Sequence, residues 1–595
     1  MTTTTATLKG GEFLLRETSP ESIFTREDLN DETRALAQGA HDFIEKEVWP
    51  QLDAIDQHES NDLMLSLLDK AAELGLLSTA LPEEYGGLGL DFNTNTALSI
   101  ALGPSASFGV ALAAHTGIGT LPILYFGTTE QKQRYLPKLA TGELKAAYCL
   151  TEPGSGSDAL AAKTKAELSA DGEHYILNGQ KMWITNGGFA DIFIVFAKVD
   201  GEHFSTFIVE ANTPGVSRGA EERKMGIKGS STTQVFLENV KVPAENLLGE
   251  KGKGHKIAFN ILNIGRFKLC AMVVGAAQRC ITTSVEYANG RIQFAKPISS
   301  FGAIQHKLAE QAIRNYVAES ATYWASALIK TKIDELKSSG RSYEEALMGA
   351  AEEYAIECAM LKVLGSEMLD YVVDEMVQIH GGYGFSEEYP AARAYRDSRI
   401  NRIFEGTNEI NRLLTIDMLV KRALKGQLDI MTPAMAIQKE LMSVPSTGET
   451  IEGVLGAERK IIANAKKAIL MVAGAAAQKL MAKLEHEQEI VMNIADMLIE
   501  TFAAEAAVLR AAKLTSSTGE QEAQHYITMA RVYLNDAIER INLAGKEAIT
   551  AFAEGDEQRM MLLGLKRFTK TESINTKAMR REIAAKLIEE NGWCF

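Results

Sequence analysis

The chain has 595 residues, with 62 basic and 78 acidic side chains and a formal net charge of −16. At about 150 residues per domain, this length predicts three or four domains. A hydrophobic content of 46% with 24% charged residues is typical of globular proteins and excludes wholesale disorder. Because an acidic chain is repelled by phosphate, we expect no nucleic-acid binding and no broad adhesion to anionic lipid.

The cysteine content and the N-terminal segment both indicate a cytoplasmic protein. The five cysteines include no CxxC pair, which favours a reducing compartment over a disulfide framework. Residues 1–16 are rich in threonine and lack the apolar core of a secretory signal. No uninterrupted apolar run approaches the ~20 residues of a membrane span.

The N-terminal part of the chain is predicted to be helical. A short extension, residues 1–30, precedes a helical domain over residues 31–145, in which Leu36, Phe43 and Val48 recur at helical spacing. Short β-type runs then fill residues 146–250. Asp171-Gly172, Asn178-Gly179 and Asp200-Gly201 are read as the turns between these runs, so we expect hairpins of an antiparallel sheet.

Long helices are predicted for most of the remaining chain. Residues 251–425 contain three helical stretches, 257–287, 304–333 and 343–373, which suit a helical bundle. Residues 426–453 hold the last two prolines, Pro433 and Pro445, and are interpreted as a linker. Residues 454–595 lack proline and predict a separate all-helical C-terminal domain. The expected fold class is therefore α+β.

Familiar cofactor motifs are missing from the sequence. It contains neither GxxxxGK[ST] nor a GxGxxG between a strand and a helix, and its ten histidines show no HExxH spacing. We therefore expect no metal site and no ordinary Rossmann site.

Two segments of the β region could surround a flat polar ring. Residues 148–158 end a strand in a loop with two glycines and two serines, which exposes backbone N–H groups and hydroxyls. Trp183 stands two residues before Thr185, so an indole could cover an aromatic cofactor beside a hydroxyl. The simpler alternatives are a Ser/Gly turn and a tryptophan in the core of a sheet.

Two helix ends carry further candidate residues. Arg291 precedes Phe294 at a helix break, where a guanidinium could bind a pyrophosphate in bidentate fashion. Gln378 leads into the glycine-rich break at Gly381 and Gly382. The alternatives are a surface arginine and an ordinary helix C-cap followed by a turn.

Glu405 is the candidate general base. It follows an apolar run on the loop that opens a helix, where apolar neighbours would raise the basicity of its carboxylate. The alternative is an acidic residue in the first helical turn, favoured by the helix dipole. That alternative fits Glu409 better than Glu405.

Taken in order, these segments resemble signatures of the acyl-CoA dehydrogenase family. The resemblance spans about residues 32–424 and is closest to the very-long-chain members, which have segments similar to residues 224–228 and 259–266 and an additional helical domain. It implies a helical N-terminal domain, a central antiparallel β-domain and a helical bundle around FAD. Glu405 would be the catalytic base, by its position in the motif.

The resemblance also implies which residues hold the ligands. The cofactor-binding residues would be Tyr148, Leu150, Thr151, Gly156, Ser157, Trp183, Ile184, Thr185, Arg291, Phe294, Phe301, Gln378, Gly381, Gly382, Thr407 and Asn408. Those from Arg291 to Gly382 would reach the FAD of a partner subunit. The acyl-CoA-binding residues would be Ser157, Asn263, Gly265, Arg266 and Gly406.

The implied reaction is α,β-dehydrogenation of long or very-long-chain acyl-CoA to trans-2-enoyl-CoA in fatty acid β-oxidation. Such chemistry needs one base, a dry site and an acceptor for a hydride. Electron-transferring flavoprotein would receive the electrons, and the implied assembly is a homodimer, with a tetramer as the alternative. An acyl-CoA oxidase that uses oxygen, and a flavin-bound assembly scaffold, remain alternatives.

Three features limit or extend the resemblance. Ala295 stands where relatives usually have glycine, which affects the local loop. The helix predicted over residues 461–484 carries four lysines, directly preceded by Lys460, and could contact a membrane surface, although a solvated face is the commoner role. Residues 105–112 are rich in small side chains, which is compatible with either a deep acyl tunnel or close helix packing.

Overall fold

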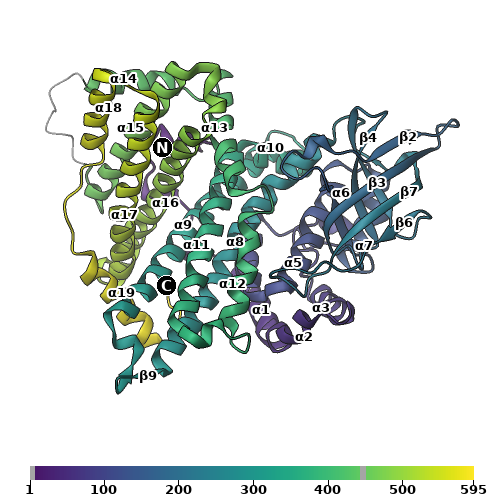
Figure 1. Cartoon of the computed structure of the whole chain (residues 1–595), viewed down its shortest axis with the longest axis horizontal. Helices are drawn as coiled ribbons and strands as arrows, with labels where there is room; N and C mark the ends of the chain where they lie inside the picture. The colour runs from purple at the N-terminus through teal and green to yellow at the C-terminus, as the bar shows by residue number, and fades with distance from the viewer. Residues whose placement is uncertain (1–6, 442–450) are drawn as a thin grey trace.

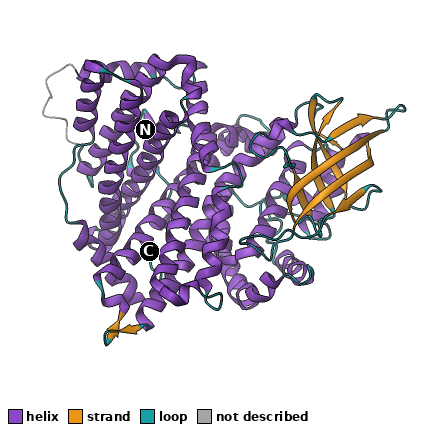
Figure 2. Ribbon diagram, in the orientation of Figure 1, coloured by secondary structure: helices purple, strands orange, loops and turns teal. Residues whose placement is uncertain are grey.

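The computed structural model describes residues 7–441 and 451–595. The helical bundle lies in the middle of an elongated molecule, with the C-terminal helices at one end and the β-sheet at the other (Figures 1 and 2). The first six residues of the expected extension and residues 442–450 of the expected linker lie outside the described residues.

The N-terminal domain is helical, as predicted. The side chain of Asn30 caps the first helix by accepting a hydrogen bond from the Thr33 N–H at 2.8 Å, and Thr128 and Gln131 form a capping box at the last. A π-helical segment, η8 (Ala114–Gly119), continues α5 directly. The helices are α1 (Asp31–Phe43), α2 (Leu52–Gln57), α3 (Asp62–Glu73), α4 (Phe92–Leu102), α5 (Ala106–Ala113), α6 (Leu121–Phe126) and α7 (Thr129–Ala140).

The central domain is one largely antiparallel sheet with the strand order β6-β7-β3-β2-β4-β5-β8. Two pairings are parallel, β1 with β4 and β2 with β4. The predicted hairpins at Asp171-Gly172 and Asp200-Gly201 are confirmed, since β2 pairs with β3 and β4 with β5 in antiparallel fashion. The strands are β1 (Ala146–Cys149), β2 (Lys165–Leu168), β3 (His174–Thr185), β4 (Ile192–Val199), β5 (His203–Glu210), β6 (Val216–Arg218), β7 (Thr232–Pro243) and β8 (Leu247–Leu248).

The turn predicted at Asn178-Gly179 is wrong. Both residues lie inside the long strand β3, where the register with β7 shifts between Leu177 and Gly179. A Cβ atom at Gly179 would lie 2.4 Å from the Thr164 hydroxyl oxygen, so glycine is needed there for a close approach of the backbone. Glycine occurs at bulges inside strands as well as at turns, so an Asn-Gly pair alone does not show that a strand ends.

The bundle is built on three long helices that cross the middle of the molecule in Figure 1. The predicted third stretch is two helices, because the chain breaks at Tyr354, whose buried hydroxyl donates to the Leu8 carbonyl at 2.7 Å. The helices are α8 (Gly254–Gly290), α9 (Gly302–Ser338), α10 (Tyr343–Glu353), α11 (Ala355–His380), α12 (Pro390–Ser398) and α13 (Asn408–Leu424). A small hairpin, β9 (Ile292–Gln293) with β10 (Lys296–Pro297), follows α8.

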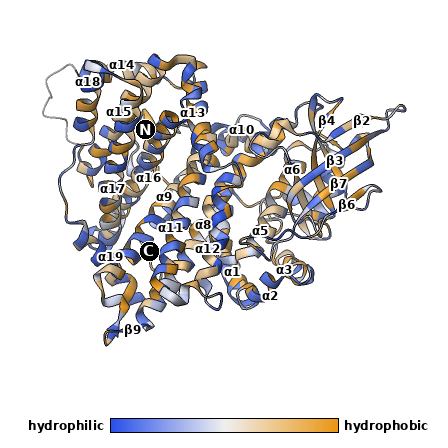
Figure 3. Cartoon of the chain, in the orientation of Figure 1, coloured by the Kyte–Doolittle hydropathy of each residue, from blue (hydrophilic) through white to orange (hydrophobic). Residues whose placement is uncertain are grey.

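Two helical stretches of the described chain are long and apolar enough to cross a membrane by length and composition. They are α8 and residues 92–126, and 67% and 72% of their most apolar windows are buried inside the protein. This burial is that of core helices. Figure 3 shows hydrophobic residues spread through the helices of the bundle and the strands of the sheet.

The C-terminal domain is all helical, as predicted, and packs along α9 and α13. Part of the expected linker is itself a helix, α14 (Met431–Leu441), so the interpretation of that part as a linker is wrong. Its Ile437 is buried, which explains why an apolar helix forms there. The other helices are α15 (Gly456–Leu480), α16 (Gln488–Thr518), α17 (Glu520–Phe552), α18 (Gly555–Phe568) and α19 (Thr576–Glu590).

The lysines of α15 do not form a row of unpaired charges on the surface. Lys466 is buried and donates to Glu505 at 2.6 Å, while Lys467 and Lys479 pair with acidic residues of neighbouring helices. These contacts serve helix packing, which weakens the argument for a membrane-facing role of this helix.

Candidate active site

Glu405 lies on a tight loop between α12 and α13. Its φ angle is 58° and that of Gly406 is 81°, so two successive residues adopt the left-handed conformation. The Thr407 hydroxyl caps α13 by accepting from the Ile410 N–H at 3.3 Å, and the Asn411 amide donates to the Gly406 carbonyl at 2.8 Å. A non-glycine residue in this conformation is uncommon and is held in place by these contacts.

The carboxylate of Glu405 rests against the backbone of α8. A Cβ atom at Gly265 would lie 2.9 Å from its Oε2 and 3.0 Å from its carboxyl carbon. Within the described part of the chain, this buried Oε2 has no hydrogen-bond partner. Burial raises the pKa of Glu405 to about 7, although Arg266 and Lys362 act to lower it.

Arg266 fixes the loop. It is 5% exposed, donates from Nε to the backbone carbonyl of Glu405 at 3.1 Å, and donates from a terminal nitrogen to Asn263 at 2.9 Å. Four of the five residues expected to hold acyl-CoA, Asn263, Gly265, Arg266 and Gly406, therefore surround the candidate base. Ser157 lies elsewhere, on an exposed loop of the β-domain.

An apolar cavity of about 250 Å³ extends from Glu405. One wall is α8, which contributes side chains from Ile261 to Thr283 along one face. The facing wall is made by α5 and η8 and is built of small residues, as the composition of residues 105–112 indicates. Its members are Ala106, Gly109, Val110, Ala113, Ala114 and Gly117.

Charged side chains line part of the same cavity, and most of them are paired. Arg393 donates to Asp56 at 2.8 Å and also to Asp53. Arg279 stacks over the Trp49 ring at 3.9 Å. The carboxyl of Asp397 accepts from the Ile227 N–H at 2.5 Å, and its burial raises its pKa to about 7.

A polar chain, buried at its inner end, runs from the base toward the C-terminal domain. The fully buried Lys362 donates to Asn408 at 2.7 Å, and Asn408 donates to Glu367 at 3.0 Å. Glu367 accepts from Arg412 at 2.8 Å, and Arg412 also donates to Asp496 of α16 at 2.6 Å. The amide of Asn408, expected to contact cofactor, is thus engaged with protein; a cofactor contact from its backbone stays a prediction.

The residues beside Glu405 in the β-domain fit a flavin ring. The hydroxyl of Tyr148 is buried and has no partner in residues 7–441 or 451–595, and its pKa is raised by burial and by Glu405. Trp183 sits at a strand bulge with φ 60° and is 53% exposed, so its indole is turned out of the sheet. Thr185 lines the cavity itself. These features leave a donor, a flat apolar ring and a hydroxyl available to a planar cofactor.

The other expected cofactor residues of the β-domain fall into three groups by their exposure. Gly156 and Ser157 lie on the exposed loop after β1, and a Cβ atom at Gly156 would meet nothing within 4 Å. Leu150 and Ile184 are buried in the core, so that only their backbone could serve a ligand. Thr151 is half-buried, and its carbonyl accepts from the Met182 N–H at 2.9 Å.

A second group of expected cofactor residues gathers at the far end of α8. Arg291 lies over the Tyr383 ring at 5.2 Å, and Phe294 contacts Phe301 with ring centroids 6.0 Å apart. Gln378, Gly381 and Gly382 are exposed at the adjoining end of α11. Arg291 directly follows α8 and is 25 residues from Arg266, which corresponds to roughly 37 Å at 1.5 Å per residue. This group therefore cannot share one site with Glu405 of the same chain.

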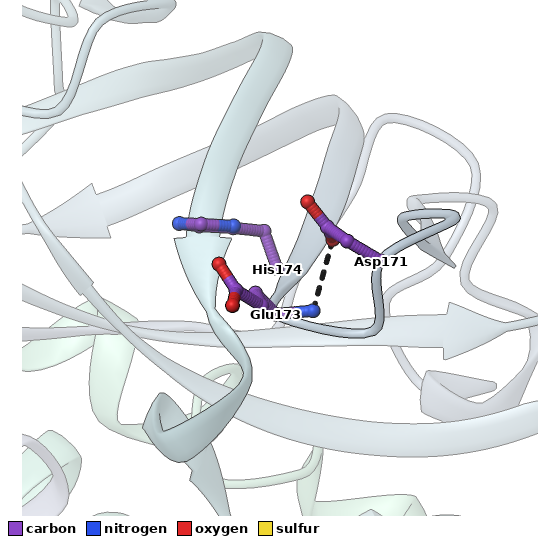
Figure 4. A group of neighbouring side chains, drawn as sticks. All are labelled: Asp171, Glu173 and His174. Atoms are coloured by element: carbon purple, nitrogen blue, oxygen red, sulfur yellow. Dashed lines mark hydrogen bonds between the residues drawn. The ribbon is translucent and has the colours of Figure 1, made fainter.

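One cluster of possible metal ligands occurs among the described residues, at the turn between β2 and β3 (Figure 4). It consists of Asp171, Glu173 and His174, and Asp171 accepts from the Glu173 N–H at 3.0 Å. The acidic members are exposed, and exposed acidic turns are common without metal. This turn belongs to the β-domain, and none of its three residues lines the cavity beside Glu405.

The sequence alone did not indicate Lys362 or Lys268 as site residues. It also did not indicate that α5 and η8 form one wall of a cavity. Both lysines interrupt apolar helical runs, residues 359–364 and 267–272, and a lone lysine in such a run is a signal that could have indicated them. Their spatial relation to Glu405 carries no sequence signal.

Four sequence models of one family match the chain. They describe the N-terminal domain (residues 30–143), the middle domain (147–240) and two C-terminal domains (252–419 and 464–567) of acyl-CoA dehydrogenase. The chain therefore belongs to the acyl-CoA dehydrogenase family, whose FAD-dependent members are oxidoreductases that act on the CH–CH group of acyl-CoA.

Individual relatives from this family match most of the chain. A probable acyl-CoA dehydrogenase of Bacillus subtilis (strain 168) is 48% identical over 98% of both chains. The mitochondrial very long-chain specific acyl-CoA dehydrogenase of Macaca fascicularis is 37% identical over 84% of this chain and 77% of its own length. The crystal structure of an acyl-CoA dehydrogenase complexed with FAD from Bacillus anthracis has a TM-score of 0.96 and 49% identity, covering 99% of this chain and 100% of that one.

Proposed function

We propose that this acyl-CoA dehydrogenase oxidises long-chain acyl-CoA to trans-2-enoyl-CoA with Glu405 as the base. The observation that carries the proposal is the buried carboxylate of Glu405, which lies against Gly265 at an apolar cavity and has one oxygen without a partner among the described residues. A base whose pKa is about 7 suits proton abstraction near neutral pH.

Each residue around the base has a defined task in this proposal. Glu405 removes the proton on the carbon α to the thioester, while bound FAD supplies the acceptor for the hydride from the β carbon. Arg266 holds the carbonyl of Glu405 and so the direction of its side chain. The apolar walls exclude water, which strengthens electrostatic stabilisation of charge on the thioester oxygen.

The length of the cavity wall favours long acyl chains. Gly265 and Thr283 are 18 residues apart on α8, or roughly 27 Å along the helix. An extended alkyl chain advances roughly 1.25 Å per carbon, given a C–C bond of about 1.5 Å. We therefore expect chains of 16 to 20 carbons, on the order of this wall length, to be accepted.

We also propose a homodimer in which Arg291, Phe294, Phe301 and the end of α11 serve the cofactor of the partner subunit. Support comes from their separation from Glu405 and from the exposure of Phe294, which is 87%. Electron-transferring flavoprotein is the proposed electron acceptor, as in the family.

The test is anaerobic bleaching of the flavin by palmitoyl-CoA. Glu405→Gln holoenzyme should bind the thioester but reduce flavin at least about 10³-fold more slowly, as expected for loss of the base. Glu409→Gln, on the first turn of α13, is the matched control and should react normally. Equal rates for Glu405→Gln and the wild type would refute the assignment.

Chain length and acceptor are tested with the same protein. A panel from butyryl- to stearoyl-CoA should give the highest kcat/KM at the long end. Turnover should depend on electron-transferring flavoprotein or a dye; release of hydrogen peroxide under air at the full rate would instead identify an oxidase.

A further inference from the structure

Lys268 is the unpaired cationic side chain in the wall of the cavity. It lies three residues after Gly265 on the face of α8 that lines the cavity. Its neighbours along that face are Ile264, Leu269 and Met272. No hydrogen bond, ion pair or ring contact to Lys268 occurs within residues 7–441 and 451–595.

The other cationic side chains of this wall have partners. Arg279 is stacked on Trp49 and lies 3.5 Å from Glu45, and Arg393 pairs with two aspartates of the N-terminal domain. Lys268 has no such compensation, and burial lowers its pKa to about 8. Lys268 is half-buried, so its amine is partly withdrawn from water and loses some of the hydrogen bonds that it would make there.

A ligand bound in the cavity could supply the partner that the described protein residues do not. Lys268 lies about 4.5 Å beyond Gly265 along the helix axis, at 1.5 Å per residue. It therefore faces the part of the acyl chain that follows the reacting carbons. A plain alkyl chain would cover the amine and offer it nothing, whereas an oxygen atom on the chain could accept its hydrogen bond.

We propose that Lys268 forms a subsite for acyl-CoA thioesters whose chain carries an oxygen acceptor, such as an oxo or hydroxyl group, beyond the reacting carbons. This proposal rests on the acyl-CoA dehydrogenation proposed above and names a substrate class for the same site. The remainder of the wall accepts the alkyl parts of the chain on either side of the oxygen.

The experiment measures binding in holoenzyme that also carries Glu405→Gln, so that no turnover intervenes. The probes are hexadecanoyl-CoA and a series of hexadecanoyl-CoAs with one oxo group at successive carbons from 5 to 12, titrated by calorimetry. We expect one position, or two adjacent positions, to bind at least about tenfold tighter than the rest, because a hydrogen bond to a charged group strengthens binding to this extent.

Lys268→Met removes the amine and keeps the length of the side chain. It should abolish this preference and tighten hexadecanoyl-CoA binding about threefold or more, since the alkyl chain then meets an apolar wall. Met272→Leu, one turn further along the same wall, is the matched control and should keep the preference. A flat oxo series in the wild type, or a preference that survives Lys268→Met, would overturn the proposal.

Failure of the subsite can be distinguished from failure of the proposed function. If hexadecanoyl-CoA bleaches the flavin of the enzyme with an intact Glu405 but the oxo series is flat, only the subsite is wrong. If neither hexadecanoyl-CoA nor any member of the oxo series bleaches it, both proposals fall.

Discussion

Charged side chains are buried in two regions, the cavity around Glu405 and the contact between the C-terminal helices and the bundle, but their partners differ. At the contact, Arg510 of α16 is fully buried and donates to Glu319 at 2.8 Å and to Glu27 at 2.6 Å. In the cavity, neither the buried Oε2 of Glu405 nor the half-buried amine of Lys268 has such a partner among residues 7–441 and 451–595.

The pKa values follow this difference. Burial alone would raise the pKa of Glu27, but Arg510 outweighs it and lowers the pKa to about 2. Burial prevails at Glu405 and raises its pKa to about 7. A paired buried charge stays ionised and joins two domains, whereas an unpaired one keeps the reactivity that a base requires.

The largest effect is expected where a paired charge is broken. Arg510→Met removes the cation that Glu319 and Glu27 share, and removal of one member of a buried ion pair typically costs about 3–5 kcal/mol of unfolding free energy. Denaturant unfolding of the holoenzyme should show this loss, with flavin reduction per folded molecule unchanged. Arg559→Met, which breaks an exposed pair with Asp556, should change stability by less than about 0.5 kcal/mol. Equal effects of the two variants would contradict the comparison.

The carboxylates of Glu405 and Glu27 should change the stability of the protein in opposite directions as the pH rises. The folded-state pKa of Glu405 lies above its ordinary value, so the unfolded chain ionises first and the native state loses stability as pH rises from about 4.5 through 7. Glu405→Gln removes this loss and should stabilise the protein by about 1–3 kcal/mol at pH 8, with a smaller gain at pH 5. Glu27, whose pKa is lowered, loses its contribution as pH falls from about 4.5 to 2. Thermal unfolding of Glu405→Gln and Glu27→Gln at low pH and at pH 8 measures the sign of each stability change.

Gly265→Ala tests how closely the base is held. The added methyl would lie 2.9 Å from Oε2 of Glu405, so the carboxylate must move by a few tenths of an ångström. We expect flavin reduction to slow by about 10- to 100-fold, because small displacements of a catalytic group are costly. Gly39→Ala in α1, where a Cβ atom meets nothing within 4 Å, is the control and should be neutral or slightly stabilising. An unchanged rate would show that the carboxylate has more freedom than this packing allows.

Lys362→Met tests the polar chain that joins the two regions. Lys362 is one of two cations that lower the pKa of Glu405, so its removal should raise that pKa further. The pH profile of flavin reduction should move to higher pH in step with it. Ser366 still donates to Asn408 at 3.2 Å, which limits the structural damage. Lys332→Met, which breaks an exposed pair with Glu335, should leave the profile in place.

The sequence predicted the residues that belong to short contiguous segments. Glu405 was identified because an apolar run, a glycine and a helix cap follow one another along the chain. The role of Lys362 depends on α11 lying beside α13, and that of Gly265 depends on a carboxylate 140 positions away; periodicity carries neither fact. Asn178-Gly179 was misread for a related reason, since a bulge and a turn use the same residues and only the position of Thr164 separates them.

Ala295 is a case in which the sequence indicated a local irregularity and the structure gives its cause. Gln293 pairs with Lys296 across a two-residue loop, and Phe294 and Ala295 have φ angles of 54° and 62°. Such a loop favours glycine at its second position because a Cβ atom in the left-handed region is strained by about 1 kcal/mol.

Ala295→Gly should therefore raise the unfolding free energy by about 0.5–1 kcal/mol, reduced by the greater freedom of glycine in the unfolded chain. Ala35→Gly, at an exposed position inside α1, is the control and should have the opposite sign, with a loss of about 0.5–1 kcal/mol. Denaturant unfolding of both variants measures the pair. A destabilised Ala295→Gly would mean that the Ala295 methyl group contributes more than the strain, for example through contact at a subunit interface next to Phe294.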